Sequence, residues 1–140
     1  MSNGSIATGA TSQAFSWVRA RANCSLLHVF NELRLGAEED VREMNTLAKL
    51  PQYSQSSLAV RANTAGDYFV VFRAENANTR VEFNCEMNRI TVQRGDGQSV
   101  ITLTLNNEGR CKLRVNGGED LEEWQVRRMM LEDLFFGPSS

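Results

Sequence analysis

The fold is decided by residues 57–115, which read SLAVRANTAGDYFVVFRAENANTRVEFNCEMNRITVQRGDGQSVITLTLNNEGRCKLRV. In this stretch, short runs of alternating apolar and polar residues are separated by residues that favour turns, mainly Gly, Asn and Asp. Alternation with a period of two places the apolar side chains of a β-strand on one face. Short connections favour antiparallel pairing between strands that follow one another in the chain. The stretch therefore predicts an antiparallel meander of about six strands with one apolar face.

Apolar residues before the meander predict a helix that covers this face. Between Ser12 and Leu50 they recur at steps of three and four, which is typical of one helical face. We expect one long helix, with Ser12 as its N-cap and an end at Leu50-Pro51. A glycine in a helix interior is unfavourable, so the pattern leaves open whether the helix bends at Gly36. The expected apolar face consists of Phe15, Val18, Ala22, Leu26, Val29, Leu33, Ala37, Val41 and Met44, widened by Leu27 and Phe30.

A second helix is predicted over residues 119–136, after the meander. Its first residues are acidic, which suits the positive end of a helix, and Gly137-Pro138 ends it. We predict an α+β fold in which both helices pack on one face of a curled sheet. Residues 1–11 are expected to be a flexible tail, and residues 12–140 a single domain. The apolar face of the second helix consists of Leu121, Trp124, Met130, Leu131, Leu134 and Phe135.

Composition and charge narrow the functional classes. The chain is 41% hydrophobic and 23% charged, as in soluble globular proteins. Its net charge of −2 lacks the excess of basic residues that is typical of nucleic-acid-binding proteins. No apolar run approaches the ~20 residues that a membrane span needs. The three cysteines, Cys24, Cys85 and Cys111, lack metal-binding spacing, and the N-terminal residues lack a signal-peptide pattern. We therefore expect reduced thiols and a cytoplasmic location.

Catalytic and metal-binding patterns are sparse. His28 is the only histidine, and Cys24 shares its helical face, but no orienting group is predicted beside this pair. Glu39 and Glu43 also share a face, yet the chain lacks the second carboxylate–histidine helix of a two-metal site. We predict no metal and no cofactor. A non-catalytic role is favoured, with enzymatic activity left open.

Three cations alternate on the last predicted strand, where Arg110, Lys112 and Arg114 should project from the outer face of the sheet. Such a stripe could bind a phosphate or another anionic partner. It is also typical of a solvated sheet surface, neutralised here by Glu82 and Glu86 of another strand. No aromatic residues interleave with the cations, which argues against single-stranded nucleic acid.

The leading functional prediction is an intracellular protein-interaction domain that self-associates as a homodimer. Two amphipathic helices, the second ending in Leu134-Phe135-Phe136, present more apolar surface than one sheet covers. The alternative is a carrier that holds a small apolar ligand between the curled sheet and a helix. Plain core packing would also explain the candidate lining residues, which are Tyr68, Phe69, Phe72, Phe83, Trp124 and Met130.

Overall fold

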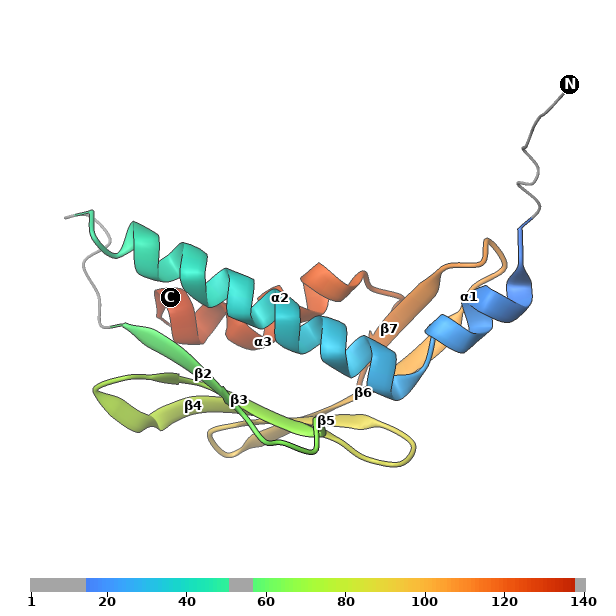
Figure 1. The fold of residues 1–140 in the computed structure, drawn as a ribbon. Helices are drawn as coiled ribbons and strands as arrows, with labels where there is room; N and C mark the ends of the chain where they lie inside the picture. The colour runs from blue at the N-terminus through green and yellow to red at the C-terminus, as the bar shows by residue number, and fades with distance from the viewer. Residues whose placement is uncertain (1–14, 51–56, 138–140) are drawn as a thin grey trace, which may run out of the picture.

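The computed structural model describes residues 15–50 and 57–137 and shows an α+β fold, as predicted (Figure 1). The predicted tail at residues 1–11 and the predicted N-cap Ser12 lie outside the described residues, as do residues 51–56 between the predicted helix and the meander. The elements are α1 (Trp17–Asn23), α2 (Leu26–Leu47), β2 (Leu58–Ala62), β3 (Tyr68–Arg73), β4 (Asn76–Cys85), β5 (Ile90–Arg94), β6 (Gly97–Leu105), β7 (Cys111–Val115) and α3 (Glu123–Phe136).

The six strands form one antiparallel sheet whose order follows the chain, which confirms the predicted meander. The sheet is open, so β2 and β7 are its edges. Asn76-Ala77-Asn78 has the residues of a turn in sequence and was predicted to join two strands, but residues 76–78 belong to β4 and the turn falls at Ala74-Glu75. The pairing of β3 with β4 shifts between Phe72 and Arg73, which brings Arg73 opposite Asn76 at the end of the hairpin.

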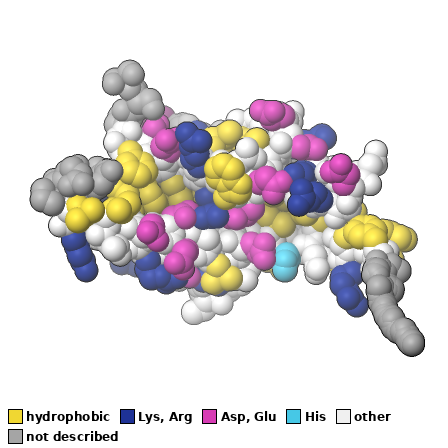
Figure 2. Space-filling model, turned by 90° about the horizontal axis from the view of Figure 1, so that it is seen from above, with side chains coloured by type: hydrophobic (Ala, Val, Ile, Leu, Met, Phe, Trp, Pro, Cys, Tyr) yellow, Lys and Arg dark blue, Asp and Glu magenta, His cyan; other side chains and the backbone are white. Residues whose placement is uncertain are grey.

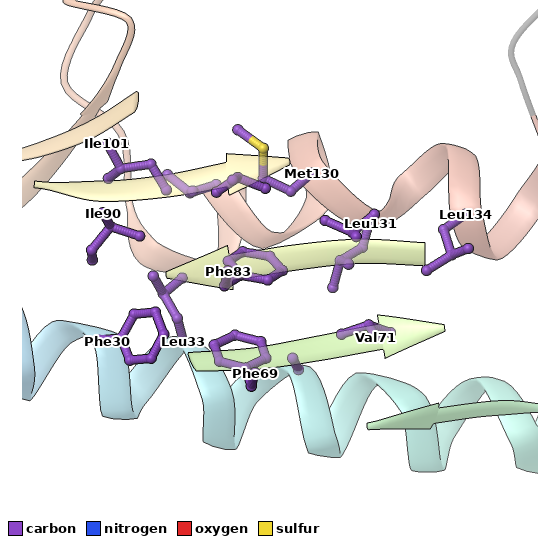
Figure 3. Packing of buried hydrophobic residues seen from close by; sticks show 14 of the residues in the cluster. Phe30, Leu33, Phe69, Val71, Phe83, Ile90, Ile101, Met130, Leu131 and Leu134 are labelled. Atoms are coloured by element: carbon purple, nitrogen blue, oxygen red, sulfur yellow. The ribbon is translucent and has the colours of Figure 1, made fainter. Parts of the chain in front are cut away.

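The helices α2 and α3 cover the same face of the sheet (Figure 1), as predicted. The core between the two layers is built around three phenylalanines from α2, β3 and β4 (Figure 3). The ring centroid of Phe69 lies 5.2 Å from that of Phe30. The Phe69 ring also stacks on the ring of Phe83, with 4.4 Å between the centroids. All three side chains are almost completely buried, so they fix α2 against the centre of the meander.

The predicted single N-terminal helix was wrong, because the structure has two helices separated at Cys24-Ser25. The backbone of Ser25 is extended, and its hydroxyl accepts a hydrogen bond from the backbone N–H of His28, which starts α2. From there α2 runs without interruption through Gly36. Its residues 29–44 bury the predicted face. In contrast Phe15, Val18 and Leu27, which were predicted to be buried, are exposed.

The last helix begins at Glu123 rather than at residue 119. The reason is that Leu121 forms a β-bridge with Leu113 of β7, with N···O distances of 2.9 and 2.7 Å, and this holds residues before the helix extended. At the new start, the side chain of Gln125 accepts a hydrogen bond from the backbone N–H of Glu122 at 2.8 Å. Trp124, which was predicted to face the core, is 54% exposed.

Candidate interaction surface on the helix layer

Two of the three cysteines form a disulfide, so the prediction of reduced thiols was wrong for Cys24 and Cys111. Their Cα atoms lie 5.3 Å apart, and the bond ties the end of α1 to the start of β7. The two cysteines are 87 positions apart in the sequence, and no spacing pattern could have paired them. Cys85 is the free thiol, and burial raises its pKa, which disfavours the reactive thiolate.

Cys24 and His28 do not form a thiol–imidazole pair in the structure. The sulfur of Cys24 is bonded to Cys111, and the half-exposed side chain of His28 lies 3.6 Å from the carboxylate of Glu32. In the part of the chain that the structure describes, no three His, Cys, Asp or Glu side chains are grouped so that they could hold a metal ion.

Of the three cations in the predicted stripe, Lys112 and Arg114 lie on β7 and are paired with acids of the same chain, whereas Arg110 precedes the strand. Lys112 pairs with Glu122, and Nε of Arg114 lies 2.6 Å from the carboxylate of Asp120. The hydrogen bond from Lys112 lowers the pKa of the Glu122 carboxyl. These acids come from the segment before α3. The two acids that we had considered as partners of the stripe pair elsewhere, Glu82 with Arg80 and Glu86 with Arg89.

The candidate ligand-lining residues are not brought together. Phe69, Phe83 and Met130 are buried in the core, whereas Tyr68 and Phe72 alternate with the buried residues of β3 and point to the other face of the sheet. On that face the guanidinium of Arg61 lies 5.2 Å from the ring of Phe72. Trp124 lies on the outside of α3 and is 54% exposed.

The outside of α3 instead presents exposed apolar side chains. Trp124 and Phe136 are 54% and 55% exposed, and Met129 is 45% exposed. In the view of the helix layer in Figure 2, hydrophobic side chains lie among charged side chains of both signs. We call this the helix-layer surface, defined as the outward side chains of α3, namely Trp124, Arg128, Met129, Glu132 and Phe136.

A hollow of about 370 Å³ lies between α2 and α3, beside the helix-layer surface. Its floor is apolar, with Met44 and Leu47 from α2 and Leu131 and Phe135 from α3. Its rim is charged, with Asp40, Glu43, Arg128 and Glu132, and the mostly buried Arg127 also lines it. An apolar floor within a charged rim is the usual arrangement of a protein-binding surface.

Arg127 fixes the spacing of the two helices below this surface. Its side chain is 16% exposed, and its guanidinium bonds Glu123 at 2.6 Å and pairs with Asp40 of α2. It also donates a hydrogen bond to the carbonyl oxygen of Gly36 at 3.1 Å. Burial raises the pKa of the Glu123 carboxyl despite its bond to Arg127. For Arg127, burial lowers the pKa, but its bonds to Glu123 and Asp40 outweigh that effect and raise it overall.

Comparison with protein-family models, with curated proteins and with solved structures found no match for this chain. Among the described helices, none is long and apolar enough to cross a membrane.

Proposed function

We propose that this chain is a non-catalytic protein-interaction domain that self-associates through the helix-layer surface. The observation that carries the proposal is the half-exposure of two large aromatic side chains, Trp124 and Phe136, on the outside of a helix whose other side is fully packed. Aromatic side chains beside a concave apolar hollow are typical of the residues that dominate binding energy in protein interfaces.

The packing beneath these residues supports a preformed surface. Val126 and Met130 hold α3 on the sheet, and Arg127 holds it against α2. The aromatic residues are already exposed without a movement of the helix. Binding therefore loses little conformational entropy of the chain. The same rigidity keeps the hollow between α2 and α3 open.

The experiment is native mass spectrometry of the purified chain, repeated over a dilution series. We expect a dimer of the wild type and a shift to monomer when Trp124 and Phe136 are both replaced by alanine, because each removes a large apolar contact. The matched control is Trp17→Ala on α1, since Trp17 is 66% exposed but lies on another element. A monomeric wild type, or an equal effect of the control, would contradict the proposal.

We propose as a second candidate function that the hollow between α2 and α3 binds a small apolar ligand, whereas the carrier site predicted from the sequence lay between the sheet and a helix. The hollow's volume of about 370 Å³ is within the range of small-molecule sites, and its floor is apolar. A carrier would show an additional mass on the native chain that is lost on denaturation. We do not extend the anion-binding hypothesis, because Lys112 and Arg114 have acidic partners within the chain.

The expected cytoplasmic location stays a prediction. It was predicted together with reduced thiols from the lack of a signal-peptide pattern, and the bond between Cys24 and Cys111 contradicts the reduced thiols. Disulfides persist mainly in oxidising compartments, so the bond favours such a compartment instead.

A further inference from the structure

Four residues of the helix-layer surface form a ridge on α3 that is inclined to the helix axis. Trp124, Arg128, Glu132 and Phe136 follow at intervals of four residues, which places them in one row of the helix surface. All four are exposed: the side chains of Arg128 and Glu132 are 66% and 46% accessible, and the two aromatic residues are more than half accessible. The order along the row is aromatic, cation, anion, aromatic.

The ridge has a hollow on each side. Toward α2 lies the hollow of about 370 Å³ with Met44 and Leu47 in its floor. On the other side lies a second hollow of about 300 Å³, beside Leu121 and Met129. Trp124, Arg128 and Glu132 line both hollows. The ridge of another helix packs into a groove beside such a ridge, so that the two ridges lie side by side.

The order of residues in the ridge is complementary to itself when reversed. A twofold axis through its midpoint, between Arg128 and Glu132, brings Arg128 opposite Glu132 of a second copy, and the reverse pair forms by symmetry. The same axis brings Trp124 opposite Phe136 of the second copy. A twofold interface uses the same patch on both subunits, so this self-complementarity is what such an interface requires.

We infer that the partner of the helix-layer surface is a second copy of this chain, docked with its α3 antiparallel along the ridge. The inference rests on the proposed function and adds the orientation and the pairing. Rows of this kind pack at a crossing angle of about −50°. The aromatic pairs supply most of the affinity, because they lose the largest apolar area to water on docking.

The charged pairs supply the orientation. In the single chain, Nε of Arg128 lies 3.2 Å from the carboxylate of Glu132, an exposed pair of the kind that contributes little to stability. In the dimer the same charges gain opposite charges across the axis. A parallel arrangement of the two helices would place Arg128 beside Arg128 and Glu132 beside Glu132, which is repulsive.

The test exchanges these charges between two variants of the full chain, Arg128→Glu and Glu132→Arg. Each variant alone places like charges opposite one another at both positions of its dimer, so we expect each to dimerise about tenfold more weakly than wild type, or weaker still. An equimolar mixture restores two opposite-charge pairs. The two variants differ in mass, so native mass spectrometry separates the mixed dimer from the two self-dimers.

We expect the mixed dimer to predominate and the double variant Arg128→Glu with Glu132→Arg to dimerise as wild type does. Arg19→Glu, a charge reversal on α1, is the matched control and should leave dimerisation unchanged. If the wild type dimerises but the variants mix only at the statistical ratio, the antiparallel pairing is wrong while self-association stands. If the wild type is monomeric at every concentration, both the pairing and the self-association are wrong.

Discussion

The guanidinium of Arg127 in α3 lies directly against the backbone of Gly36 in α2. A Cβ atom added to Gly36 would come within 2.5 Å of Nε of Arg127, and the carbonyl oxygen of the same glycine accepts a hydrogen bond from Arg127. Glycine costs about 1 kcal/mol against alanine inside a helix, and here that cost permits the close approach of the two helices. The glycine is thus explained by a contact with α3 rather than by a bend.

We expect Gly36→Ala to lower the free energy of unfolding by about 1–2 kcal/mol. The new methyl group displaces the Arg127 guanidinium from Gly36 and Asp40, and losing hydrogen bonds of a charged group outweighs the gain in helix propensity. In a background of Arg127→Ala the clash is absent, so the same substitution should stabilise the fold by about 1 kcal/mol. Chemical denaturation of the four variants measures this change of sign. An equal effect in both backgrounds would show that Arg127 does not determine the cost.

Asn45 protects the open edge of the sheet. Its side-chain amide donates to the carbonyl oxygen of Leu58 and accepts from the N–H of Leu58, both at 2.9 Å, at the start of edge strand β2. We expect Asn45→Ala to lower the free energy of unfolding by about 1–3 kcal/mol, because both backbone groups of Leu58 lose their partner. The matched control is Asn31→Ala on the exposed side of α2, which should change stability by less than about 0.5 kcal/mol.

The sequence predicted the sheet well because each strand carries its own signal. Alternation and turn residues are local, and antiparallel pairing between successive strands follows from them. The register of β3 with β4 did not follow in the same way, because the hairpin turns at Ala74-Glu75 and the pairing shifts between Phe72 and Arg73. The errors arose where distant residues determine the local structure. The start of α3 depends on the bridge between Leu121 and Leu113, and Cys24 at the end of α1 is tied to a distant strand by its bond to Cys111.

The candidate surface was predicted only in part. The sequence predicted that the last helix has more apolar surface than the sheet covers, but it placed Trp124 on the buried side of that helix. The spacing of Trp124, Arg128, Glu132 and Phe136 would have separated this row from the buried row of Val126, Met130 and Leu134.

The disulfide should contribute strongly to stability. It links residues 87 positions apart. Closing a loop of that length lowers the conformational entropy of the unfolded chain, which stabilises the folded state by about 2–5 kcal/mol. Replacing Cys24 and Cys111 by serine should lower the free energy of unfolding by that amount. Reduction should bring the wild type to the level of the double variant and leave the double variant itself unchanged. Alkylation of the denatured, unreduced chain should modify Cys85 alone; labelling of all three cysteines would show that the bond does not form.

Two neighbouring carboxyl groups should give opposite pH dependence. The hydrogen bond from Lys112 lowers the pKa of Glu122 below its ordinary value of 4.5, so the folded state binds this proton less readily than the unfolded state. The stabilisation is therefore present above pH 4.5 and is lost as the pH falls through the lowered pKa. As the pH falls from about 6 to about 3, we expect the free energy of unfolding of the wild type to decrease relative to that of Glu122→Gln.

Burial raises the pKa of Glu123 above 4.5, so its contribution has the opposite sign. It is fully present below the unfolded value and is lost as the pH rises through the raised pKa. The stability of wild type relative to Glu123→Gln should consequently increase on acidification, whereas relative to Glu122→Gln it should decrease. Chemical denaturation of the three proteins at a series of pH values measures both trends. If the two variants followed the same trend, the ion pair of Glu122 with Lys112 and the burial of Glu123 beside Arg127 could not both be as the structure has them.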